Sequence, residues 1–241
     1  MIFGALLLEL AALYFLSRWV TQAIFMFFLL VFRVRAVAVS LLLVLQLPGT
    51  VVHELSHLFT AEMLGVKTGK LRLEPESIRE ADIQAGSVMI AETDPFRRYA
   101  IGLAPLWWGM IGLTAISYFL PGIVNSVFHS GLPIFGNSNT YLLLSLSYLL
   151  FAISNTMFSS PKDLEGFLPF AIVIALITGA AFIFGLRIDL TGQLLELVVR
   201  ILTTLTRSIG VVLGINIGLL TSIKLLTSLL SRVLRVRVVR Q

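Results

Sequence analysis

Long apolar stretches separated by short polar breaks dominate this chain. Residues 2–32 are almost wholly apolar and end at Arg33-Val34-Arg35. This length is enough for one long tilted membrane helix, or for two shorter segments that meet near Arg18. A second apolar helix is expected over about 36–64, because Gly65 is a natural helix stop.

Further apolar segments follow the same pattern. Asp94-Pro95 is a helix-starting signal, so a third helix is expected to run to about Leu120. The charge-free segment 121–139 reads as a loop. The remaining expected elements are membrane spans at about 140–157, 167–187 and 209–231 and an amphipathic, interfacial helix at 193–207. The fold class is therefore mainly α, a polytopic membrane helical bundle of about six transmembrane helices.

Residues 66–93 depart from this apolar pattern. Lys70 to Glu74 alternate polar and apolar side chains, and Ser87 to Ala91 read as a second strand after Gly86. We expect a small membrane-associated β-hairpin or sheet here; the alternative is a polar loop without ordered strands.

Composition agrees with a membrane protein. Hydrophobic residues make up 57% of the 241 residues and charged residues only 13%, whereas soluble domains carry about 25% charged residues. The net charge of +5 is read as a membrane-topology signal, because basic residues lie mostly between or beyond the spans, and no nucleic-acid partner is expected. Residues 1–241 are expected to form a single integral membrane domain.

The positions of the basic residues predict an orientation. If the spans alternate, residues 65–94 and the C-terminus share one side, which carries most of the lysine and arginine residues. The positive-inside rule makes that side cytoplasmic. The protein is thus expected to be a multi-pass membrane protein with both regions in the cytoplasm.

The second apolar helix contains His53-Glu54-Leu55-Ser56-His57, one turn after Pro48-Gly49, which are expected to kink or loosen it. His53 and His57 are four residues apart and share a helix face, so both can bind one metal ion. Glu54 can act as a base on a water molecule held by that ion. A packed histidine pair is the alternative, but ionisable groups inside a membrane segment are costly and are functional candidates by default.

A third ligand has to come from elsewhere in the chain. Only three histidines and no cysteines are present, and the remaining one, His129, is expected on the opposite side. Glu62 is too close in sequence to His57 to reach the same ion easily. Asp163 is the preferred ligand and Glu165 the alternative, because both belong to a polar break at a similar membrane depth. Asp163 could instead serve only to start a helix after Pro161.

These motifs resemble the site-2 protease family of intramembrane zinc metalloproteases. His53-Glu54-Leu55-Ser56-His57 matches its first motif fully, Asn155 to Gly166 is similar to its second, and Ala104-Pro105 resembles the helix start between them. The similarity covers roughly residues 36–187, the metalloprotease-like core. The family's Leu-Asp-Gly is Leu164-Glu165-Gly166 here, a departure typical of a divergent member. The resemblance implies that Asn155 binds substrate by donating a hydrogen bond to it or to the oxyanion, although a packing role is equally open.

The expected activity is zinc-dependent hydrolysis of peptide bonds within or near the bilayer. One Zn²⁺ ion polarises the carbonyl and holds the water, and Glu54 moves the proton to the leaving amine. The expected partners are a membrane protein or peptide substrate and the lipid bilayer. The alternative is a membrane metal-binding or transport protein without protease activity.

Overall fold

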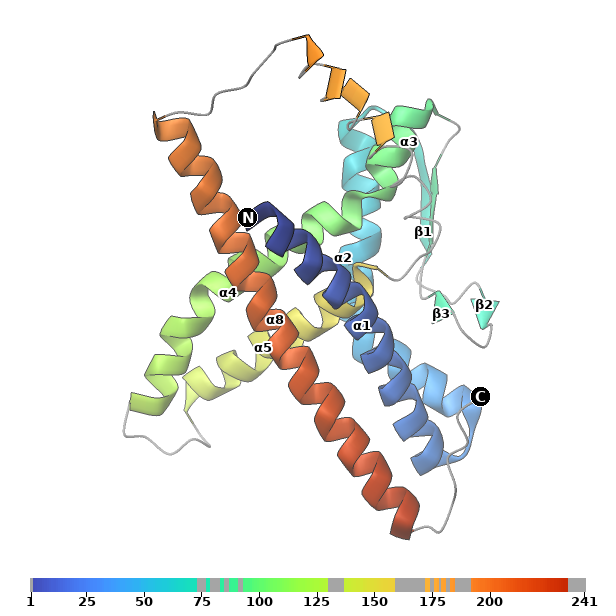
Figure 1. Ribbon diagram of the computed structural model, residues 1–241. Helices are drawn as coiled ribbons and strands as arrows, with labels where there is room; N and C mark the ends of the chain where they lie inside the picture. The colour runs from blue at the N-terminus through green and yellow to red at the C-terminus, as the bar shows by residue number, and fades with distance from the viewer. Residues whose placement is uncertain are drawn as a thin grey trace.

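The computed structural model describes residues 2–72, 77–78, 83–84, 87–90, 93–129, 137–158, 172–173, 176–177, 179–180, 183–184 and 192–233. Within these ranges the long helices are α1 (Ile2–Phe32), α2 (Arg35–Met63), α4 (Ala104–His129), α5 (Ser138–Thr156) and α8 (Gly192–Val233), and α3 (Pro95–Gly102) is short. Figure 1 shows these helices crossing one another around α5.

Four helical segments of the described chain are long and apolar enough to cross a membrane: α1, α2, α3 together with α4, and α8. Their outer surface is apolar, as the exposed side chains of Leu8, Tyr118 and Phe119 illustrate. Polar side chains such as Gln46 and Asn216 are buried instead. This arrangement suits a bundle surrounded by hydrocarbon, where only the interior can satisfy polar groups. The number of spans in the whole chain stays a prediction.

Several helix boundaries differ from those predicted. For residues 2–32, where one helix and two were both open, the structure has one helix. The expected loop at 121–139 is wrong over its first part, because α4 continues through Pro121 to His129. The expected interfacial helix at 193–207 and span at 209–231 form one continuous helix, α8, since no proline interrupts them. The predicted span at 167–187 lies mostly outside the described residues.

Four short strands occupy the region between α2 and α3. β1 (Thr68–Arg72) pairs antiparallel with β4 (Ser87–Ile90), and β2 (Ser77–Ile78) pairs antiparallel with β3 (Ile83–Gln84). β1 and β4 also contact α2. The polar residues after Gly65 therefore contain a β1–β4 pair next to the helix that carries the histidine motif. Association of this pair with a membrane surface stays a prediction.

Two apolar clusters of the described residues join α1 to α8. In the first, Leu13 of α1 packs with Ile209 and Val212 of α8 and with residues of α4 and α5. In the second, Ile24, further along α1, packs with Leu220, further along α8. The two helices therefore run parallel, as Figure 1 also shows.

The α1–α2 turn and the end of α8 lie at the same end of the bundle (Figure 1). α2 runs away from that end for 29 residues. The cytoplasmic placement of residues 65–94 and of the C-terminus stays a prediction.

Candidate functional site

α2 turns its polar residues inward along a single stripe. Its buried side chains include His53, Glu54, Ser56 and His57, all less than 8% exposed. The helix contains Pro48, and Figure 1 shows its axis changing direction near the middle. The predicted kink therefore lies just ahead of the histidine motif, where the proline lacks a backbone N–H.

The two histidine rings meet at their outer nitrogens. His53 Nε2 and His57 Nε2 are 3.3 Å apart, and the two ring planes are nearly perpendicular at 83°. Zinc holds imidazole nitrogens at about 2.0–2.1 Å in tetrahedral geometry, which separates two such nitrogens by roughly 3.3–3.4 Å. The pair therefore has the spacing that one tetrahedral ion requires, and the donor set fits zinc.

The tautomer of His57 follows from its second contact. His57 Nδ1 lies 2.8 Å from the backbone oxygen of Ile101, at the end of α3. A carbonyl oxygen only accepts, so Nδ1 must carry the hydrogen and donate. In a neutral ring this leaves the lone pair on Nε2, the nitrogen that faces His53. Metal-binding histidines characteristically have such an outer partner.

Glu54 lies beside this pair on the same helix. Its side chain is 4% exposed, so it sits in the interior with the histidines and not on the outer surface of α2. Glu62, on the same helix, is exposed. The two glutamates of the motif helix are therefore distinguished by burial: Glu54 is buried, as both histidines are, and Glu62 is exposed.

The described part of the chain contains no group of three histidine, cysteine or acidic side chains able to hold a metal, and a third ligand for His53 and His57 stays a prediction. The predicted ligands Asp163 and Glu165 both lie outside the described residues. His129 ends α4 and is exposed, with its Nδ1 3.1 Å from the Asn125 carbonyl. It therefore takes no part in the pair formed by His53 and His57.

α5 packs against the motif helix at a glycine. A Cβ atom built on Gly49 would lie 2.5 Å from both the Ala152 carbonyl carbon and Thr156 Oγ1, and closer still to the Ala152 oxygen. Gly49 is one turn before His53 on the same stripe. Small residues at a helix crossing allow such close approach in membranes. The C-terminal end of α5 thus lies beside the turn that precedes the histidine pair.

The two helices run in the same direction at this crossing. Tyr148 of α5 donates a hydrogen bond to the Leu45 carbonyl of α2 at 3.0 Å. Four residues further along each helix, Gly49 of α2 faces Ala152 of α5. Beyond α5, Met157 packs in the apolar cluster that Val52 also contacts. The chain that leaves α5 is therefore still close to α2 next to His53.

Asn155 belongs to a buried hydrogen-bond network between α5 and α8. Its Nδ2 donates to the Phe151 carbonyl and to Asn216 Oδ1, both at 2.8 Å. Asn216 Nδ2 in turn donates to Ser154 Oγ at 3.0 Å. Both Nδ2 hydrogens of Asn155 thus have acceptors, while its buried Oδ1 accepts no hydrogen bond from the described residues. The group left to meet a substrate is this acceptor, not the donor that we expected.

Asn216 is the residue of this network that the sequence analysis missed. Its side chain is 0% exposed in the middle of α8. An amide within an apolar membrane segment is itself a signal, because such a group needs a partner from another helix. Trp108 Nε1 of α4 donates a further hydrogen bond between helices, to Thr60 Oγ1 of α2 at 3.1 Å.

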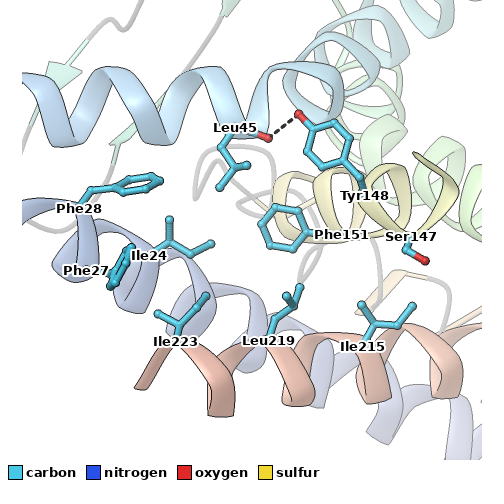
Figure 2. A pocket seen from close by; sticks show the side chains of 10 residues that line it. All are labelled: Ile24, Phe27, Phe28, Leu45, Ser147, Tyr148, Phe151, Ile215, Leu219 and Ile223. Carbon is cyan, nitrogen blue, oxygen red and sulfur yellow. Dashed lines mark hydrogen bonds between the residues drawn. The ribbon is translucent and has the colours of Figure 1, made fainter. Parts of the chain in front are cut away.

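An apolar cavity of about 380 Å³ lies elsewhere between α1, α2, α5 and α8. Figure 2 shows aromatic and aliphatic side chains around it, and the Tyr148 hydroxyl turned toward the Leu45 carbonyl. Leu45 is two helical turns before His53 on α2. No ionisable acid, base or histidine lines the cavity, so it does not form part of the candidate metal site.

Comparisons of the chain with protein-family models, with curated proteins and with solved structures find no match. The resemblance to the site-2 protease family therefore continues to depend on the motifs alone.

Proposed function

We propose that this protein is a zinc-dependent peptidase of the membrane, which hydrolyses peptide bonds of membrane-associated substrates within or near the bilayer. The observation that carries the proposal is the pair of buried imidazoles on α2, whose Nε2 atoms are 3.3 Å apart, directly beside a buried glutamate. Two imidazoles, one acid and an adjacent base form the donor set of a hydrolytic zinc site.

His53 and His57 would supply two ligands and Asp163 the third, with Glu165 as the alternative. The described chain reaches Phe158, five residues before Asp163. Five extended residues span at most roughly 17 Å. Thr156 Oγ1 would lie 2.5 Å from a Cβ atom built on Gly49, one turn before His53, so the chain that follows α5 starts close to the histidine motif.

The residues of the chain would divide the chemistry between them. Bound zinc supplies a Lewis acid that polarises the scissile carbonyl and lets water ionise near neutral pH. The Glu54 carboxylate takes the proton from the attacking water and gives it to the leaving amine. Asn155 Oδ1 accepts an N–H of the substrate backbone. The edge of the β1–β4 pair, next to α2, holds the substrate extended by adding it as a strand.

The test is Glu54→Gln in purified, zinc-loaded protein in liposomes, with Glu62→Gln as the matched control on the exposed side of the same helix. Single-span membrane peptides are added and new termini are read by mass spectrometry. We expect cleavage by the wild type and by Glu62→Gln, its loss in Glu54→Gln, and bound zinc in all three.

Two outcomes would count against the peptidase. If the wild type produces no termini beyond those of Glu54→Gln, the hydrolytic assignment is wrong. If zinc is also carried across the liposome membrane equally well by both proteins, the metal-transport alternative replaces it, because ion transfer does not need a base beside the ligands.

A further inference from the structure

The carbonyl that orients His57 comes from a specific place in the fold. Ile101 lies in the last turn of α3 and is 0% exposed. Its side chain packs with Ala61 and Val66, on either side of the α2 C-terminus. Val66 N–H also donates to the Ala61 carbonyl at 2.9 Å, and Gly65 takes the left-handed conformation with φ of 70°. This is the hydrogen-bonded helix ending that glycine favours, and it fixes Ile101 beside α2.

Backbone carbonyls around Ile101 follow a regular helical pattern. Arg98 N–H donates to the Asp94 carbonyl at 3.0 Å and Leu103 N–H to the Tyr99 carbonyl at 3.0 Å. Trp107 N–H donates to the Leu103 carbonyl at 3.3 Å. Each of these donors lies four residues after its acceptor, as in any α-helix.

The junction between α3 and α4 interrupts this pattern. α3 ends at Gly102 and α4 starts at Ala104, and Leu106 N–H donates to the Leu103 carbonyl, three residues earlier, at 3.1 Å. Four places after Ile101 stands Pro105, which has no backbone N–H to donate. The Ile101 carbonyl accepts the His57 Nδ1–H, and the Leu103 N–H is also directed to it.

We propose that Pro105 is a positioning residue for the metal site. By withholding a backbone N–H, it keeps the Ile101 carbonyl available to His57. That hydrogen bond sets the Nδ1–H tautomer and turns Nε2 toward His53 and the ion. The purpose of the arrangement rests on the proposed metal-dependent function, whereas the hydrogen bond itself can be tested without metal.

The same contact assigns the tautomer of His53 before and after metal binding. Since His57 Nε2 carries a lone pair, the 3.3 Å contact between the Nε2 atoms requires His53 Nε2 to be the donor in the neutral, metal-free pair. Binding both Nε2 atoms to one ion requires that hydrogen to leave. His57 is therefore already in its binding tautomer, and His53 has to change.

The experiment introduces the missing N–H with Pro105→Ala and Pro105→Gly. Both variants restore the donor, but they differ in helix propensity by about 1 kcal/mol, which separates the effect of the N–H from that of helix stability. Pro121→Ala is the matched control, because it removes an exposed proline from the same helix α4, away from the site.

The first readout is ¹⁵N NMR of histidine-labelled, metal-free protein. With only three histidines in the chain, His57 can be assigned by comparison with His57→Gln. We expect the Nδ1–H tautomer in the wild type and in Pro121→Ala, and a tautomer mixture in both Pro105 variants. The second readout is Zn²⁺ affinity by competition with a chelator, which we expect to fall about 10–100-fold in both Pro105 variants, the usual cost of losing an outer partner of a ligand.

Three results would overturn the proposal. Unchanged His57 tautomers in the Pro105 variants would show that the N–H does not compete for the carbonyl. Changed tautomers with unchanged Zn²⁺ affinity would show that the hydrogen bond does not position the ligand. Equal losses in Pro121→Ala would show a general effect of helix proline. A wild type that binds no Zn²⁺ would refute the proposed function, and the tautomer comparison would still decide whether Pro105 controls His57.

Discussion

Replacement of Gly49 by alanine tests how closely α2 and α5 fit together. The added Cβ atom would lie 2.5 Å from the Ala152 carbonyl carbon and nearer to its oxygen. Carbon–oxygen contacts of this kind are normally about 3.3–3.6 Å long, so the helices would have to separate by roughly 1 Å. The obstructing atoms belong to the backbone of α5 and cannot rotate away.

The size of the effect follows from two opposing terms. Overpacking of a filled interior costs typically 1–3 kcal/mol, and this rigid contact belongs at the upper end of that range. Alanine in place of glycine gains up to about 1 kcal/mol of helix propensity. We therefore expect Gly49→Ala to lower the free energy of unfolding by about 2 kcal/mol, which is roughly 4–8 °C in the melting temperature of a chain this long.

The same displacement would reach the proposed active site. α5 leads directly into the segment that carries Asp163, and a 1 Å misplacement of catalytic groups can cost about 100-fold in rate. Peptide cleavage by Gly49→Ala is thus expected to fall by about that factor, even at temperatures where the variant is folded. Cleavage and thermal unfolding are measured in the same detergent.

Gly112→Ala is the control, because it adds a methyl group on α4 that faces the same helix α5. Its Cβ atom would meet only Ile153 Cδ1, at an ordinary contact distance of 3.9 Å. This variant should be as stable as the wild type or slightly more so, with unchanged cleavage. Equal stability and equal cleavage of Gly49→Ala and Gly112→Ala would refute the close crossing at Gly49.

Two further predictions concern the polar groups of the interior. Asn216→Ala removes the acceptor of Asn155 and should lower the free energy of unfolding by about 1–2 kcal/mol, the upper range for polar contacts between membrane helices. The control Asn125→Ala, at an exposed position, should lower it by less than about 0.5 kcal/mol. Equal losses in the two variants would argue against the hydrogen-bond network. Asp163→Ala should abolish stoichiometric Zn²⁺ in purified protein, whereas Glu165→Ala should retain it. Metal analysis with the reverse result would make Glu165 the ligand, and full zinc in both variants would reject each of them.

Patterns of neighbouring residues, such as apolar runs and helix-ending glycines, were sufficient to predict many of the helices. The apolar runs indicated α1 and α2 with boundaries close to those of the structure, because helix length and hydropathy are properties of neighbouring residues. Gly65 ended α2 as expected, through a left-handed conformation that glycine adopts without strain. Pro121 did not end α4, because packing and the membrane environment can tolerate a proline that a local rule reads as a break.

The parallel packing of α1 and α8 shows what local rules cannot decide. Leu13 shares one apolar cluster with Val212, and Ile24 shares another with Leu220, so α1 and α8 run in the same direction. The direction of a late helix depends on every connection before it, and patterns of neighbouring residues do not give those connections.

The sequence by itself determined which groups the candidate site contains: two imidazoles at helical spacing and an acid beside them, on an apolar segment. Tertiary structure alone decided how those groups are oriented. The Ile101 carbonyl, 44 residues from His57, selects the ring nitrogen that faces His53, and Asn216, 61 residues from Asn155, takes the hydrogen that we had expected to reach the substrate. Helical spacing fixes which side chains share a face, but hydrogen-bond partners from distant segments fix the tautomer and the free acceptor, and these arise only when the helices pack together.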